Sequence, residues 1–371
     1  MRIGYSFWGY LGDYKYDAQG DAASTPDGNA TYSWSIICAA MKAGHKVYPM
    51  QNDRDAPGFA KHGLGLFSSF SQWKRYAAYK HLRENYDSLW NSQYGLPSFP
   101  KLDVLLLEWR FPIPGRNVEV DKTSAAYQPD WDRQQELLQH YLGTKTKVII
   151  WDLDNKLTLS DELVLSEKGD FSIFETAVQP ETQFVPRIRV EPPFLMEDVL
   201  QYSSCRVNKN KKIVYIGSRY ERDDVIDEWL GSGEDIHFHG KWDDDAKKCW
   251  PHITFHERCT TKDFGGIYRD AAIVPLLAKR SYMKRGFITP RPIEALLFGS
   301  LPVGLAGHLG IENYVLPDFV VNNHEELQNI SRDVAKYGCS SENRQLDREE
   351  LAHKLSFMDA GNFIKRIEEL V

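Results

Sequence analysis

Short apolar runs separated by amphipathic stretches recur along the first half of the chain. The runs that have the length and composition of strands lie at residues 2–7, 45–50, 104–107 and 148–151. Apolar positions at helical spacing occupy residues 31–43, 68–90 and 129–142, and Gly44 provides a stop for the first of these helices. Alternation of helices with continuously apolar strands predicts a parallel sheet covered on both faces.

The pattern breaks at residues 186–200, where prolines occupy positions 186, 192 and 193, and a polar, basic stretch follows at 206–212. Alternation then restarts. The predicted elements are strands at 213–216, 236–239, 272–276 and 301–305, helices at 223–230, 263–270 and 292–298, and terminal helices at 325–337 and 348–370. We therefore expect two Rossmann-like, doubly wound halves, 1–195 and 196–350, with a ligand cleft at the carboxyl ends of their strands. Residues 351–371 are expected to form a helix that packs back on the first half.

Composition narrows the class of protein. The formal net charge of −7 does not suggest a surface coated for nucleic acid, although local basic patches remain compatible with it. The chain has five cysteines, no CxxC and no apolar run of about 18 residues, so we expect a reduced, cytoplasmic protein without a membrane span. We also expect a monomer.

The segment from Gly286 to Gly304 carries the most specific chemistry. It reads as a loop, a helix with Arg291 and Glu294 in its first turn, a glycine stop and an apolar strand. Arg291 and Glu294 are three residues apart, so both side chains can lie on one helix face. A guanidinium near a helix N-terminus favours phosphate, and a neighbouring carboxylate can accept both hydroxyls of a ribose. The combination predicts a nucleoside diphosphate site.

Four segments, 212–219, 236–240, 287–294 and 319–327, extend this observation. In order and approximate spacing they resemble the GT-B glycosyltransferases, and among these the DNA β-glucosyltransferases of T-even phages. The resemblance implies a UDP-sugar donor, most simply UDP-glucose, with Mg²⁺ or Mn²⁺ as an optional partner of the diphosphate. The donor-binding residues that it implies are Gly217, Ser218, Arg219, Arg222, Arg258, Tyr282, Arg291 and Glu294.

The same resemblance places a catalytic base at Asp154, just after the strand at 148–151. An inverting transfer needs one carboxylate to remove the proton of the acceptor hydroxyl. Asp152 is the alternative base, and Glu108 is a more distant one. Residues 148–155 also resemble the first motif of haloacid-dehalogenase-like phosphatases, but Lys156 replaces the usual threonine there. A metal-binding Asp-x-Asp of the other glycosyltransferase fold and a simple turn or helix cap are further interpretations.

Two basic clusters are candidates for contact with a phosphate backbone. The first contains Lys74 and Arg75 within an aromatic helical stretch, for which a solvated helix face is the alternative. The second, beside the donor loop, consists of Lys279, Arg280, Lys284 and Arg285. His252, His256, Cys249 and Cys259 match no zinc spacing, so no metal site is predicted.

The resemblance implies transfer of glucose, with inversion, to the hydroxymethyl group of a modified pyrimidine in duplex DNA. Such an enzyme must flip the target base out of the helix. A GT-B transferase that acts on a glycan or another small acceptor is the alternative. A binding module without catalysis is disfavoured, because the sequence contains both a donor site and a candidate base.

Overall fold

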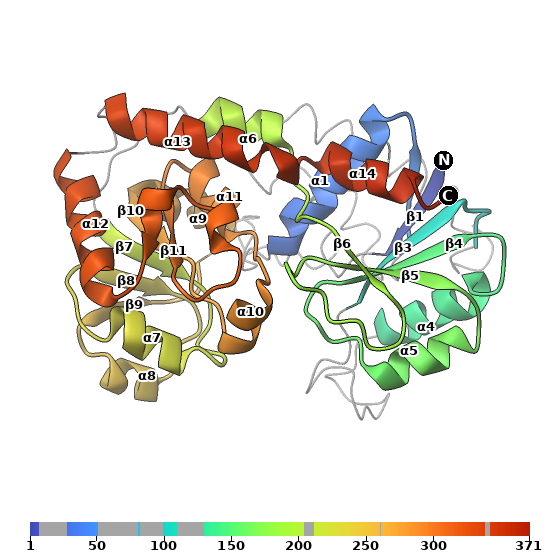
Figure 1. Ribbon diagram of the computed structural model, residues 1–371, viewed down its shortest axis with the longest axis horizontal. Helices are drawn as coiled ribbons and strands as arrows, with labels where there is room; N and C mark the ends of the chain where they lie inside the picture. Colours follow the sequence, from blue (N-terminus) through green and yellow to red (C-terminus); the bar gives the residue numbers. More distant parts are fainter. Residues whose placement is uncertain are drawn as a thin grey trace, which may run out of the picture.

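The computed structural model describes residues 1–6, 28–50, 81, 99–109, 130–203, 211–259, 261–337 and 342–371. Among these residues, two parallel six-stranded sheets with flanking helices lie side by side along the long axis of the molecule (Figure 1). The predicted α/β class with two doubly wound halves is therefore confirmed. Most of the helix predicted at 68–90 lies outside the described residues. No helix in the described ranges is both long and apolar enough to cross a membrane.

The N-terminal sheet has the strand order β2-β1-β3-β4-β5-β6, with every neighbouring pair parallel. Its strands are β1 (Arg2–Ser6), β2 (Lys46–Pro49), β3 (Val104–Trp109), β4 (Lys147–Asp152), β5 (Phe171–Glu175) and β6 (Arg187–Arg189). The helices of this half are α1 (Gly28–Lys42), α4 (Asp130–Tyr141) and α5 (Leu159–Ser166). Every residue of β3 is buried, as expected for a strand covered on both faces.

The C-terminal sheet has the order β12-β11-β10-β7-β8-β9, which is the strand order of the Rossmann fold. Its strands are β7 (Lys211–Ile216), β8 (Ile236–His239), β9 (Ile253–His256), β10 (Ala271–Pro275), β11 (Leu301–Leu305) and β12 (Val320–Val321). The helices that accompany them are α7 (Asp223–Leu230), α8 (Asp244–Cys249), α9 (Thr261–Asp270), α10 (Arg280–Arg285), α11 (Arg291–Leu297) and α12 (His324–Tyr337).

The prediction that the alternation breaks at residues 186–200 is wrong. Arg187–Arg189 forms the edge strand β6, and α6 begins at Met196 and ends at Ser203. A strand of three residues is too short to show a periodic pattern. It is stabilised by pairing with β5 and by the burial of the Arg187 side chain, which are tertiary interactions.

The chain crosses between the two halves at neighbouring points. Phe194 N donates to Met358 O over 2.9 Å, and Ala360 N donates to Phe194 O over 2.8 Å. Between these crossings, α6 packs against α13 (Glu342–Lys354) over the C-terminal half, whereas α14 (Ala360–Glu368) packs against α1 (Figure 1). The return to the N-terminal half thus begins near Asp359, and residues 351–354 still belong to α13.

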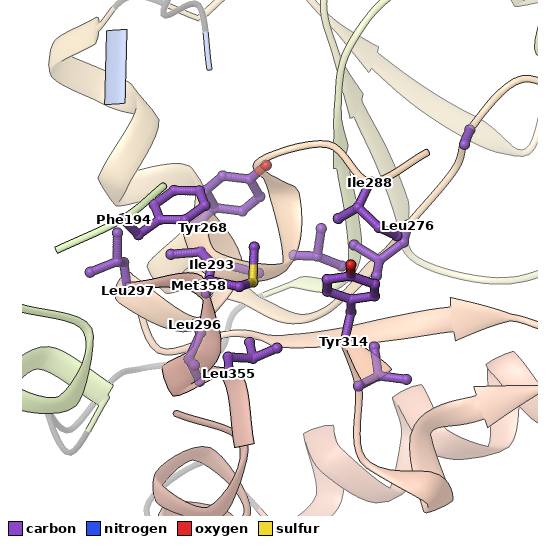
Figure 2. Close-up of a cluster of buried hydrophobic side chains, with 14 of the residues drawn as sticks. Phe194, Tyr268, Leu276, Ile288, Ile293, Leu296, Leu297, Tyr314, Leu355 and Met358 are labelled. Atoms are coloured by element: carbon purple, nitrogen blue, oxygen red, sulfur yellow. The ribbon is translucent and has the colours of Figure 1, made fainter. Parts of the chain in front are cut away.

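Apolar side chains of both crossing segments join the core beneath α11. Figure 2 shows Phe194 and Met358 close to Ile293 and Leu297 of this helix, and all four side chains are buried. Helix α11 also contacts α6. The helix that carries Arg291 and Glu294 is therefore fixed at the junction of the two halves.

Candidate functional site

A crevice lies where the carboxyl ends of β7 and β10 diverge. In open parallel sheets, ligands bind where the direction of the crossover connections changes, and these two strands flank that point here. An open cavity of about 810 Å³ occupies the position. Ser218, Arg219, Lys279 and Arg280 are among the residues that line it. Two predicted donor residues and two predicted DNA contacts therefore share one cavity.

Arg291 is held at the end of β7 by contacts of its own half. Its Nε donates to Ile216 O over 3.2 Å, and one terminal nitrogen lies 3.4 Å from Thr289 Oγ1. The guanidinium carbon lies 4.9 Å from the ring centroid of Tyr215, a cation–π distance. These contacts fix the plane of the guanidinium before any ligand arrives.

Gly217 follows Ile216 directly and makes room for this guanidinium. A Cβ at Gly217 would lie 2.5 Å from the Tyr215 hydroxyl and 2.8 Å from Arg291 Nη2. Only glycine therefore permits this approach of the strand end to Arg291. The backbone of Gly217 also donates to His239 O over 2.9 Å, which anchors the turn.

Glu294 lies one helical turn beyond Arg291 and is 7 % exposed. Its neighbours include Tyr268 and Cys259, whose side chains are buried. Burial, reinforced by the Glu294 carboxylate, raises the pKa of the Tyr268 phenol well above its ordinary value. Burial likewise raises the pKa of the Cys259 thiol to about 11, again with a smaller contribution from Glu294. Both neighbours are therefore uncharged at neutral pH, and the carboxyl group of Glu294 is buried one helical turn from Arg291.

Arg219 lies in the cavity but is engaged by acidic residues. It forms hydrogen bonds with Asp223, Asp243 and Asp245 at 2.6 to 3.0 Å, and its guanidinium lies over Trp250. The hydrogen bonds that Arg219 donates to these carboxylates, Asp223 foremost, raise its pKa above the ordinary value. Its charge is thus compensated locally, which weakens its assignment to the diphosphate.

Arg222 and Arg258, the other predicted donor arginines, lie at the surface of this region. Arg222 donates to Tyr220 O over 2.7 Å and so stabilises its own loop. Arg258 is exposed, two residues beyond the end of β9. The ring of His256, the last residue of β9, stacks on His239 with 4.3 Å between centroids.

Asp154 lies in the N-terminal half, across the junction from the crevice. It is half-buried in the turn after β4, and its carboxylate lies 3.6 Å from Lys156 Nζ. Tyr282 of α10 donates from its hydroxyl to Asp154 O over 3.2 Å, and this bond joins the two halves. Lys279 Nζ in turn lies 4.4 Å from the Tyr282 ring centroid. The structure therefore brings the predicted base, Tyr282 and the crevice residue Lys279 together.

Asp152 has a different environment, with a side chain that is fully buried. Its oxygens accept from Lys156 N at 2.8 Å, from Leu157 N at 3.2 Å and from Arg187 Nη1 at 2.8 Å. Burial raises the pKa of Asp152, but all three neighbours are donors and oppose this shift. Because a protonated acid would direct a hydrogen at one of these donors, we assign the ionised form. Asp152 shapes the turn, and the geometry favours Asp154 as the group open to an acceptor.

Glu108, the distant alternative base, is also buried. Its Oε1 accepts from the Tyr5 hydroxyl at 2.6 Å. This contact lies inside the N-terminal half, at the end of β3. Glu108 is therefore less accessible to an acceptor than Asp154.

The second basic cluster is less positive than its sequence suggests. Lys279 lies 3.2 Å from Glu221, and Arg280 pairs with Asp224 and Glu228 of α7. Arg285 pairs with the buried Glu175 of β5, whereas Lys284 is exposed. Acidic side chains that are distant in sequence thus pair with three of the four cations of this predicted DNA-binding cluster. Lys74 and Arg75 lie outside the described residues.

Three buried charged residues next to the turn that carries Asp154 were not predicted from the sequence: Arg187, Glu175 and Glu162. Their signals were weak: an arginine at the start of a three-residue strand, a glutamate at the end of an apolar run, and a glutamate within α5. Only their mutual contacts reveal a shared role. Within the described ranges, no group of three His, Cys, Asp or Glu side chains could hold a metal ion.

Comparison with known proteins shows similarity in structure but not in sequence. No protein-family model matches the chain, and no curated sequence matches it significantly. The β-glucosyltransferase of phage T4 in complex with UDP-glucose superposes with a TM-score of 0.60 at 11 % identity, covering 100 % of this chain and 99 % of that one.

Two further structures are similar over the same extent. An α-glucosyltransferase in complex with UDP and a 13-mer DNA containing a HMU base gives a TM-score of 0.55 at 13 % identity, covering 100 % and 99 % of the two chains. HepE of Anabaena in complex with UDP-glucose gives 0.50 at 10 % identity, covering 100 % and 98 %. Likeness at such identities establishes the fold. The chain has the GT-B fold, as the sequence resemblance predicts.

Proposed function

We propose that this protein is a glycosyltransferase that uses a UDP-sugar, with glucose as the transferred sugar. The arrangement of Arg291, Gly217 and Glu294 at the end of β7, where the next residue, Ser218, lines the crevice, carries the proposal. A fixed guanidinium against an open strand end suits a diphosphate, and a buried carboxylate one turn away suits a ribose. Structural neighbours from two different sources were solved with UDP-glucose, which supports the choice of donor.

Asp154 is the proposed general base. It removes the proton of the acceptor hydroxyl while the oxygen attacks the sugar C1, and the bond from C1 to the diphosphate oxygen breaks on the opposite face with inversion. Arg291 stabilises the charge that develops on the departing diphosphate. The T4 enzyme was also solved with UDP and Mn²⁺. In this chain a divalent ion would be held chiefly by the diphosphate, where it would neutralise charge.

For the acceptor we propose a hydroxymethylated pyrimidine in duplex DNA, flipped out of the helix. The support is the likeness over the full chain to two kinds of glucosyltransferase, one called a DNA-modifying enzyme and the other solved with DNA. One observation favours a second candidate, a glycan or other small acceptor. The pairing of Lys279, Arg280 and Arg285 with acidic side chains reduces the positive charge beside the crevice.

The test is a transfer assay with radiolabelled UDP-glucose and three acceptors: duplex DNA with 5-hydroxymethylcytosine or 5-hydroxymethyluracil, unmodified duplex DNA, and a mixture of oligosaccharides. Arg291→Ala serves as the donor-site control, because it removes the guanidinium at the strand end. Label in the modified DNA alone supports the proposal. Label in oligosaccharides alone supports the second candidate. No transfer and no hydrolysis of UDP-glucose would contradict both.

A further inference from the structure

A buried network of charges lies directly beneath the turn that carries Asp154. Arg187 donates through Nη1 to Asp152 Oδ2 at 2.8 Å and to Glu175 Oε2 at 2.9 Å, and through Nη2 to Glu162 Oε1 at 2.9 Å. All four side chains are fully buried. Arg285, from the C-terminal half, completes the network by pairing with Glu175 Oε1.

This network stabilises the turn that carries Asp154. Asp152 accepts the backbone N–H groups of Lys156 and Leu157, and Arg187 Nη2 donates to Leu157 O over 3.2 Å. Asn155, inside the turn, has a φ of 51°, a left-handed conformation that asparagine tolerates better than most other non-glycine residues. The position of Asp154 thus depends on Asp152 and Arg187.

Helix α10 of the C-terminal half makes two contacts here, one with the turn itself and one with the charge network beneath it. Tyr282 donates directly to Asp154 O, and Arg285, three residues later on the same helix face, binds Glu175. Backbone bonds fix the helix there, since Gln179 N donates to Arg285 O and Val178 N donates to Gly286 O, each over 3.1 Å.

We propose that Arg285 and Tyr282 are positioning residues for Asp154, so that the base is held in place only when the C-terminal half is docked against the N-terminal half. The inference rests on the proposed function, in which Asp154 is the base. Its physical reason is that catalysis requires tight placement: an error of about 1 Å in a reacting group can cost about 10²-fold in rate. Because α10 contacts the turn that carries Asp154, the placement of Asp154 depends on the C-terminal half, which binds the donor in the proposed function.

The first test does not depend on activity. Arg285→Gln leaves Glu175 paired with Arg187, so we expect the fold to survive. Hydrogen exchange of the peptide covering residues 153–158 should then show at least about tenfold faster exchange at the amides of Lys156 and Leu157. Tyr282→Phe, which removes only a hydroxyl, should loosen the same peptide. Arg332→Gln on the exposed face of α12 is the matched control. Unchanged exchange in both test variants would overturn the inference.

The second test is a double-mutant cycle in the transfer assay with UDP-glucose. Arg285→Gln should lower kcat about tenfold or more, with KM for UDP-glucose within about twofold of the parent. In an Asp154→Asn background the same change should have almost no effect, because there is no base left to position. A full additional loss in that background would overturn the inference.

A wrong assignment of the base and a wrong assignment of the positioning residues would give different results. If Asp154→Asn were fully active, the proposed base would be wrong, and the inference would be wrong with it. If Asp154→Asn were inactive while Arg285→Gln and Tyr282→Phe behaved like Arg332→Gln in both tests, the inference alone would be refuted.

Discussion

Asp152 and Asp154 are two residues apart, and replacing each by asparagine should produce opposite effects on stability and on turnover. The Asp154 side chain is 38 % exposed, and its carboxylate lies 3.6 Å from Lys156 Nζ. A surface pair of this kind contributes about 0–1 kcal/mol to stability. Asp154→Asn should therefore leave stability nearly unchanged, yet lower turnover by about 10²–10⁴-fold because the proton acceptor is lost.

Asp152→Asn should act mainly on stability. Each of the three groups that face Asp152 donates, so the NH₂ of an asparagine must point at a donor. Breaking one partner of a buried ion pair costs about 3–5 kcal/mol, and we expect the lower end because Arg187 keeps Glu162 and Glu175. Turnover should fall less than in Asp154→Asn, through loosening of the turn.

The assays are urea unfolding followed by tryptophan fluorescence, and transfer from radiolabelled UDP-glucose at saturating donor. Asp170→Asn, an exposed aspartate ahead of β5, is the matched control. The reasoning is refuted if Asp154→Asn retains full turnover while Asp152→Asn is stable but inactive, because the two roles would then be exchanged. Equal, small losses of turnover in both variants would place the base elsewhere.

Three other outcomes are expected. Arg291→Ala should weaken UDP binding by roughly 1.5–3 kcal/mol, measured by calorimetry, with a smaller loss for Glu294→Gln; unchanged UDP affinity in folded Arg291→Ala would contradict the donor site. Burial lowers the pKa of His308 to about 4, so the folded state favours the neutral ring. The free energy of unfolding should therefore keep its full value above pH 6.5 and decrease as the pH falls towards 4. His308→Gln should then abolish up to about 3 kcal/mol of this acid destabilisation in urea titrations, and an identical pH dependence in the variant would count against it. Binding of duplex DNA should weaken steeply with salt, and Lys284→Gln should reduce that slope by about one unit in a log–log plot; a slope near zero for the parent would favour the small-acceptor alternative.

Local sequence patterns predicted the class of fold, which the structure confirms, and they singled out the helix proposed to bind the donor. Strands such as β3 and β4 are continuously apolar, so their burial in a parallel sheet follows from composition. The spacing of Arg291 and Glu294 on one helix, behind a loop and ahead of an apolar strand, is local, and the structure has both on α11, with Arg291 donating to Ile216 O at the end of β7. Local patterns suffice where hydrophobic periodicity and helix geometry decide the outcome.

Which charged side chains remain available to a ligand depends on contacts between segments that are distant in the sequence. In the sequence, only the family resemblance favours Asp154 over Asp152 as the base, whereas in the structure a partner 35 residues away in the chain, Arg187, makes Asp152 a buried structural anion. Arg280 and Arg285 likewise read as free cations until α7 and β5 place carboxylates against them. The free energy of a charged group depends on its solvation and on neighbours that folding brings together, and neither is encoded in adjacent residues.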